Sequence, residues 1–224
     1  MMEFSRWMSL IGEGLSETLY MTLVSTFFAY LFGLPLGVLL TVTSPSGIQP
    51  MPRLNRVLGV IINSLRSVPF LILLVAVLPL TRKLVGTTIG STATIPPLVI
   101  AAAPFIARVV ESSLLEVDAG LIEAAESMGA SPYQIITKVL LTEARSSLAT
   151  GAVIATTTIL GYSALAGFTG GGGLGAIAVN YGYHRYQTDV MLWTVFLLIV
   201  IVQIIQEVGM RLSRRMDARL RSKS

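Results

Sequence analysis

Long stretches without a charged side chain constrain this chain more than any other feature of its sequence. No Asp, Glu, Lys or Arg lies between Glu17 and Arg53, and none lies between Arg145 and Arg185. Charged residues make up 12% of the 224 residues and hydrophobic residues 53%, with a mean hydropathy of +0.75. Soluble domains carry about a quarter charged residues. The sequence therefore predicts an all-α polytopic membrane protein.

A transmembrane helix needs about 20 apolar residues to cross about 30 Å of hydrocarbon. The uncharged stretches supply five predicted spans, near residues 19–40, 57–80, 89–112, 148–168 and 190–210. We expect residues 1–224 to form one membrane domain. Its largest connection between spans is the segment 116–143, which lies between the third and fourth spans.

The basic residues predict the orientation of the chain, because Lys and Arg stay on the cytoplasmic side of a membrane. Six of them follow the fifth span, where the only acid is Asp217; they are Arg211, Arg214, Arg215, Arg219, Arg221 and Lys223. This predicts a cytoplasmic C-terminus and, with five spans, an extracytoplasmic N-terminus. The same cluster could bind anionic lipid, but orientation alone accounts for it.

Small residues and prolines characterise the span interiors. Gly33 and Gly37 form a small-xxx-small pair, and Ala101 to Ala103 with Ala107 give the third span a similar face for close helix packing. Prolines in the first three spans predict helix breaks, which a membrane tolerates beside other helices or a water-lined cavity. They are Pro35, Pro69, Pro79, Pro96, Pro97 and Pro104. Broken helices favour a transport path over a simple anchor.

The segment 116–143 reads as two short helices joined by a turn. Asp118 is placed to cap the first helix, and Gly129 stands where a left-handed residue ends it. Ser131 to Gln134 matches a capping box with proline at the first helical position. This pattern fits a connection lying on the lipid surface and a docking element for a partner equally well.

The residues Glu123-Ala124-Ala125, followed by Gly129 and Leu141, resemble the Glu-Ala-Ala loop of bacterial ABC importer permeases. That family usually has proline after the leucine, where this chain has Thr142, so the exit of the second helix departs from the pattern. Further motifs resemble the methionine-uptake branch of the family. They are Asn63 to Phe70, Ala103 to Arg108, Gly161 to Ala164, Gly170 to Gly175 and Tyr181 to Tyr183.

The resemblance implies a permease of the bacterial cytoplasmic (inner) membrane that pairs with a second copy of itself. It implies two cytoplasmic ABC ATPase subunits, which would hold ATP and Mg, and an extracytoplasmic substrate-binding lipoprotein or periplasmic protein. Methionine, as the D- or L-form, is the expected substrate, moved by alternating access. The residues expected to couple the permease to the ATPase are Glu123, Ala124, Ala125 and Gly129.

The chain itself has no sign of a nucleotide, cofactor or metal site. No Lys follows a Gly, so a phosphate-binding Gly-Lys-Ser/Thr loop is missing. Gly170, Gly172 and Gly175 match a dinucleotide-type glycine spacing, but they follow a span rather than a strand and are expected to form a flexible turn at the mouth of the path. With no Cys and one His, His184, neither a metal site nor enzyme activity is expected, and the basic charge is explained by topology rather than nucleic acid.

Arg66 is the one charge inside the predicted second span. Either it lines the path or meets the substrate carboxylate, or the span starts later and Arg66 snorkels to the cytoplasmic edge. The candidate path residues are Arg66, Pro69, Tyr162 and Ser163.

An ATP-independent secondary amino-acid carrier is the alternative function. Proton-driven carriers keep carboxylates within the membrane, yet no Asp or Glu lies between Thr18 and Val110. Sodium coupling through backbone carbonyls remains open, although no inverted repeat is visible. A membrane enzyme would need a nucleophile, base or metal cluster, which the sequence lacks.

Overall fold

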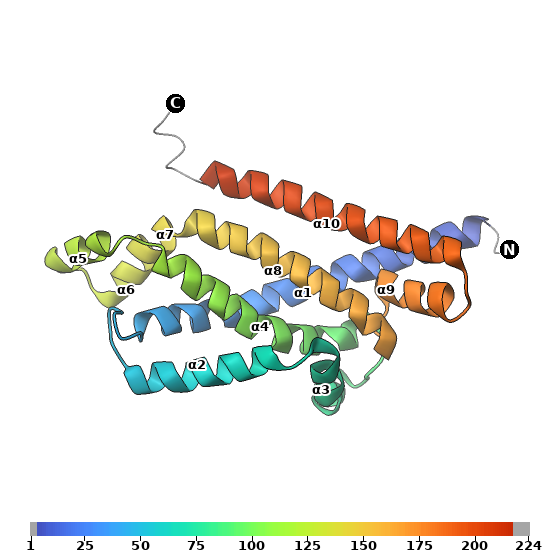
Figure 1. Ribbon diagram of the computed structural model, residues 1–224, viewed down its shortest axis with the longest axis horizontal. Coiled ribbons are helices and arrows are strands. Elements are labelled where there is room, and N and C mark those ends of the chain that lie inside the picture. The colour runs from blue at the N-terminus through green and yellow to red at the C-terminus, as the bar shows by residue number, and fades with distance from the viewer. Residues whose placement is uncertain (1–3, 217–224) are drawn as a thin grey trace. The chain divides into compact units, whose positions relative to one another are not determined.

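A computed structural model describes residues 4–216 of the chain, and within that range every regular element is helical (Figure 1). The predicted all-helical class is therefore confirmed. Four of the residues used in the topology argument, Asp217, Arg219, Arg221 and Lys223, lie outside the described range.

Four helices are long: α1 (Phe4–Val42), α4 (Ser91–Leu115), α8 (Arg145–Leu165) and α10 (Thr188–Met216). Two shorter helices follow α1, namely α2 (Pro52–Ser67) and α3 (Phe70–Val85). Between α4 and α8 the chain forms α5 (Ala119–Ser127), α6 (Pro132–Gln134), the π-helix η1 (Ile135–Leu140) and α7 (Leu141–Glu143). The 3₁₀-helix η2 (Ala166–Thr169), α9 (Gly173–Ile177) and the π-helix η3 (Ala178–Tyr183) lead from α8 to α10.

The second predicted span is two helices rather than one. Four apolar stretches of the described chain are long enough to cross a membrane, and the pair α2 and α3 makes five if it counts as one broken span. The break lies at Val68 and Pro69, because a proline disfavours helical conformation in the residue before it and has no N–H to donate. The Pro69 carbonyl then accepts hydrogen bonds from the amides of Ile72 and Leu73, each at 3.0 Å, and opens α3. Arg66 therefore stands in the last turn of α2, not in the middle of one span.

The other prolines do not end a helix. α1 continues through Pro35 and α3 through Pro79, while α4 includes the remaining three. The expected breaks are thus found at Pro69 alone. Proline inside a membrane helix is tolerated where neighbouring groups satisfy the freed carbonyl, so its presence does not by itself predict a break.

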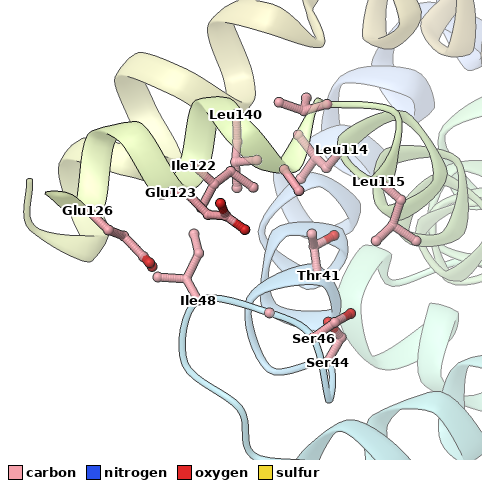
Figure 2. Close-up of a pocket in the computed structure, with 13 residues that line it drawn as sticks. Thr41, Ser44, Ser46, Ile48, Leu114, Leu115, Ile122, Glu123, Glu126 and Leu140 are labelled. Carbon is pink, nitrogen blue, oxygen red and sulfur yellow. The ribbon is translucent and has the colours of Figure 1, made fainter.

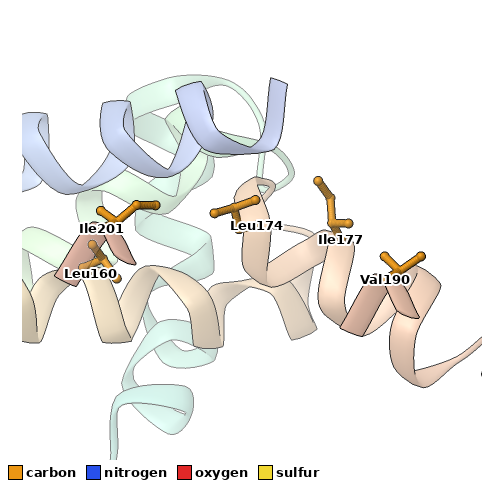
Figure 3. Packing of buried hydrophobic residues seen from close by; sticks show 5 residues of the cluster. All are labelled: Leu160, Leu174, Ile177, Val190 and Ile201. Carbon is orange, nitrogen blue, oxygen red and sulfur yellow. The ribbon is translucent and has the colours of Figure 1, made fainter. Parts of the chain in front are cut away.

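The chain divides into two compact units, to each of which α1, α4, α8 and α10 contribute residues. The first comprises the described residues of Met1–Ala29, Val68–Ala102 and Thr156–Gln206. Its apolar core is formed by Leu160, Leu174, Ile177, Val190 and Ile201 (Figure 3). Two of these five come from the short helix α9, and van der Waals packing holds them against side chains of α8 and α10. The glycine-rich segment that leads into α9 is therefore anchored by its own helix.

The second unit comprises the described residues of Tyr30–Ser67, Ala103–Ala155 and Glu207–Ser224. Here the two glycines of α1 lie against α4: a Cβ added at Gly33 would stand 2.8 Å from the Ala103 carbonyl oxygen, and one at Gly37 would stand 2.6 Å from that of Ala107. The predicted small-residue faces of the first and third spans thus pack against each other. Beside them, Leu40, Ile62 and Ala107 form a small apolar core.

Candidate functional site

The segment between α4 and α8 forms the helical hairpin that the sequence predicts. Asp118 caps α5, its Oδ1 accepting a 2.7 Å hydrogen bond from the Gly120 amide. At the other end the Ala130 amide donates to the Ala125 carbonyl at 3.0 Å, and Gly129 adopts a left-handed φ of +78°. This arrangement satisfies carbonyls that the helix end leaves unpaired, which is why a glycine is favoured there. These local hydrogen bonds thus determine where α5 begins and ends.

The second helix of the hairpin begins as predicted and then departs from α-helical geometry. The Gln134 amide donates to Ser131 Oγ at 3.4 Å, and Gln134 Oε1 accepts from the Ser131 amide at 2.8 Å, completing the capping box. From Ile135 the chain is a π-helix, and its two ends, Ile135 and Leu140, are buried. The two buried side chains are thus five residues apart, the hydrogen-bond spacing of a π-helix.

Thr142, where the related loop usually has proline, takes part in a side-chain hydrogen bond. Its hydroxyl donates to the Thr137 carbonyl at 3.2 Å, five residues earlier. A side-chain donor thereby satisfies a backbone acceptor next to the point where the π-helix ends. Thr142 closes the exit of the hairpin without a proline.

The four predicted coupling residues do not share one environment. Glu123, Ala124 and Gly129 are exposed, whereas Ala125 is only 5% exposed and packs within its own unit. The outer face of α5 and its C-cap residue instead present two exposed apolar side chains that were not predicted as coupling residues, Leu121 and Met128, the latter 83% exposed. Their spacing around Ala124, at i, i+3 and i+7, places the three on one helix face. This spacing of apolar residues is the sequence pattern from which the exposed face could have been predicted.

The inner side of α5 borders a cavity of about 390 Å³. Glu123 and Glu126 extend toward the connection between α1 and α2, which contributes Ser44 and Ile48 to the opposite wall (Figure 2). The described lining contains two carboxylates and several hydroxyls but no basic side chain. The cavity is therefore suited to a positively charged group.

Three of the four candidate path residues belong to the first unit. The Tyr162 ring stacks on that of Phe70, with centroids 4.6 Å apart and planes 5° from parallel, beside Pro69 at the start of α3. Ser163 is buried and donates its hydroxyl to the Leu160 carbonyl at 2.7 Å. The break after α2 and the aromatic residue of α8 are thereby brought together.

Arg66 belongs to the second unit, where its guanidinium lies 6.0 Å from the centre of the Phe105 ring. This is at the outer limit of a cation–π contact. No acidic partner of Arg66 is found among residues 4–216. The exposed side chain thus lies near an aromatic ring, with no described carboxylate paired to it.

The glycine segment 170–175 is a tightly packed turn, in contrast to the flexible one expected. The Gly173 amide donates to Glu17 Oε2 at 2.6 Å, and the Leu174 amide donates to Thr18 Oγ1 at 2.9 Å. The Gly170 carbonyl also accepts from the Gly90 amide at 2.8 Å. A phosphate site needs such amides free, so the chain's own side chains occupy the donors that a nucleotide would require.

Comparison with known proteins places the whole chain in context. A family described as binding-protein-dependent transport system inner membrane component matches residues 33–222. A probable D-methionine transport system permease protein MetI of Vibrio cholerae serotype O1 is 52% identical over 203 residues, which cover 91% of this chain and 90% of that protein. The D-methionine transport system permease protein MetI of Escherichia coli strain K12 is 53% identical over 160 residues, covering 71% and 74%.

Solved structures show the same fold. A chain of the MetNI methionine ABC transporter, in an inward-facing conformation, is 49% identical, with a TM-score of 0.94 over 96% of this chain and 99% of that one. A chain of an amino acid ABC transporter reaches a TM-score of 0.78 over 96% and 99% at 20% identity, a likeness of fold alone.

Proposed function

Since the chain belongs to the family of binding-protein-dependent transport system inner membrane components, we propose that it is the permease subunit of an ATP-driven methionine importer. It is a multi-pass protein of the bacterial inner membrane that forms the path and leaves ATP hydrolysis to a partner. The names of relatives that are about half identical over most of their length, D-methionine transport permeases, support this substrate.

The observation that carries the proposal is the capped hairpin between α4 and α8. Its outer face carries Leu121, Ala124 and Met128, an apolar stripe that the other described residues leave exposed. We infer that this stripe seats in a groove of the ATPase and that Gly129 permits the turn that presents it. Glu123 then faces, with Glu126, a cavity that a basic side chain of the ATPase can enter.

The proposed assembly follows because the transport path and ATP hydrolysis belong to different subunits. Two copies of this chain enclose the path, two ATPase subunits bind the paired hairpins and hold ATP and Mg, and an extracytoplasmic binding protein delivers methionine. This requires the hairpin and the C-terminus on the cytoplasmic side and the N-terminus outside. The membrane-spanning helices are then in contact with lipid. The six basic residues from Arg211 to Lys223 and the positive-inside rule support that orientation.

The path is proposed to pass the break between α2 and α3. Arg66 has a charge suited to a substrate carboxylate, and Pro69 creates the break that frees backbone groups. Tyr162 stacks on Phe70 at the start of α3, while Ser163 supports it through its hydrogen bond within α8. Closing and opening of the two ATPases would move the paired hairpins and expose this region alternately to each side.

The test is purification of the tagged chain from its native membrane, followed by transport in vesicles. Two copies with two ATPase subunits, and methionine uptake that needs ATP and the binding protein, are expected. A chain that purifies without an ATPase under conditions that preserve other ABC complexes, and that moves an amino acid without ATP, would favour the secondary carrier instead.

A further inference from the structure

We propose that Arg108 is a positioning residue that ties α2 to α4 and so passes movement of the coupling hairpin to the helix that carries Arg66. The inference rests on the proposed importer function and adds the residues that transmit the movement. All of them lie within the second unit.

The guanidinium of Arg108 bridges two helices. Its Nη1 pairs with Glu111 Oε2 on α4 at 2.6 Å. Its Nη2 donates to Asn63 Oδ1 at 3.0 Å and to the Gly59 carbonyl at 3.3 Å, both on α2. A planar guanidinium has donors in a fixed fork, so one side chain holds both helices in a defined register.

The other described contacts of α2 include apolar packing and a hydrogen bond to α1. Ile62 is the one buried residue of this 16-residue helix. Near the start of α2, Asn55 Nδ2 donates to the Leu40 carbonyl of α1 at 2.7 Å, and Leu58 packs beside Ile62. Arg108 adds directional hydrogen bonds between α2 and α4, and a hydrogen bond, unlike an apolar contact, depends on direction. A Cβ at Gly59 would stand 3.3 Å from Arg108 Nη2, so the glycine gives the guanidinium room to approach. Farther along α2, Arg66 lies over the Phe105 ring of α4. We call the contacts of Arg108 and Arg66 between α2 and α4 the seam.

The charges of the seam explain how it persists in a largely apolar region. Arg108 and Glu111 side chains are 25% and 16% exposed and form a neutral pair, which limits the cost of removing them from water. Arg108 Nε is buried without a hydrogen-bond partner among the described residues. The guanidinium therefore keeps one donor that a new arrangement of α2 and α4 could satisfy.

The seam is also directly connected to the hairpin. Arg108 lies two turns before the end of α4 at Leu115, and α5 begins at Ala119. Leu114 and Val117 are buried, which holds this short connection in place. Displacement of α5 by the ATPase therefore moves Arg108, and Arg108 moves α2 through Asn63.

The test uses the complete importer, with its ATPase and binding protein, in proteoliposomes. We expect Asn63→Ala and Arg108→Lys each to raise the number of ATP molecules hydrolysed per methionine imported by about tenfold, the effect of losing one hydrogen bond to a charged group. The double variant should be no worse than either single one, because both remove the same link. Asn63→Asp should keep the wild-type ratio, since its carboxylate still accepts from Nη2.

The controls separate this role from folding and from the importer function itself. Ser64→Ala, at an exposed neighbour of Asn63, should keep the ratio, and the thermal midpoint of each assembled complex is measured alongside. An unchanged ratio in Arg108→Lys, or losses that add in the double variant, overturns the proposal. If Arg108→Lys fails to assemble, Asn63→Ala decides alone, because it leaves the Arg108–Glu111 pair intact. A wild-type complex without ATP-dependent uptake refutes the importer function and not the seam.

Discussion

The carboxylate of Glu17 accepts a 2.6 Å hydrogen bond from the amide of Gly173, joining two residues 156 positions apart within one unit. Thr18, the next residue of α1, accepts from the Leu174 amide in the same way. Cβ atoms added at Gly172 and Gly173 would each stand 2.7 Å from these two acceptors, on Glu17 and Thr18 respectively. The glycines are required because α1 approaches the turn this closely.

Glu17→Ala should lower the free energy of unfolding by about 1–3 kcal/mol, because the Gly173 amide loses its acceptor. Glu17→Gln, which keeps an uncharged acceptor, should have an intermediate effect. The measurement is the midpoint of denaturant unfolding of the solubilised protein. Glu13→Ala is the matched control, one turn earlier on α1 and exposed. Equal losses in the Glu13 and Glu17 variants would show that the hydrogen bond contributes nothing.

Two glycines of α1 should respond to alanine in opposite directions. Gly37→Ala places a Cβ 2.6 Å from the Ala107 carbonyl oxygen and from Val110 Cβ, so we expect overpacking to cost about 1–3 kcal/mol. Gly12 has no atom within 4 Å of an added Cβ, and Gly12→Ala should stabilise the helix by about 0.5–1 kcal/mol. Thermal unfolding of both variants measures this contrast, and a shift of the same sign in both would contradict the packing of α1 on α4.

Gly129 should tolerate a residue that adopts left-handed backbone and resist one that does not. Its surroundings are empty within 4 Å of an added Cβ, so the penalty comes from φ alone and amounts to about 1–2 kcal/mol for most residues. Gly129→Val should therefore weaken retention of the ATPase on the tagged chain by about fivefold to about thirtyfold. Gly129→Asn is the control, because asparagine accepts this conformation. Equal loss in both would mean that the side chain, not the turn, disturbs docking.

Local sequence patterns were enough to predict the hairpin, but they could not predict contacts between residues far apart in the chain. Asp118, Gly129 and the pair Ser131 and Gln134 act on backbone groups a few residues away, so their roles can be deduced from spacing. The Val68-Pro69 dipeptide likewise carries a local reason for the helix break. Other prolines carry the same signal without a break, since their surroundings rather than their sequence decide the outcome.

Arg108 shows where sequence reasoning ends. Its pairing with Glu111 could be predicted from the sequence, because the two residues are three positions apart on one helix. Its bond to Asn63 joins two motifs that the sequence offers separately, and nothing in either one indicates that they meet. Glu17 and Gly173 are a second such pair, which is why the glycine turn could be read as flexible.

Met128→Asp should weaken retention of the ATPase by more than about tenfold while leaving the permease folded. Met128 is 83% exposed on the stripe with Leu121 and Ala124, so its side chain contributes little to the fold. If the stripe seats in the ATPase, the substitution loses about 1.5–3 kcal/mol of apolar burial and adds an unpaired carboxylate to the interface. Together these exceed a tenfold loss of affinity, which co-purification at graded ATPase concentrations can measure.

Ser127→Ala is the control on the neighbouring exposed position, where only a hydroxyl bond to the Glu123 carbonyl is lost. It should keep the ATPase bound, because Ser127 lies off the stripe. Full retention in Met128→Asp would place the docking surface elsewhere on the hairpin. The cavity beside Glu123 and Glu126 would then be the next surface to test, with Glu126→Lys replacing one of its two carboxylates by a like charge for the incoming basic group.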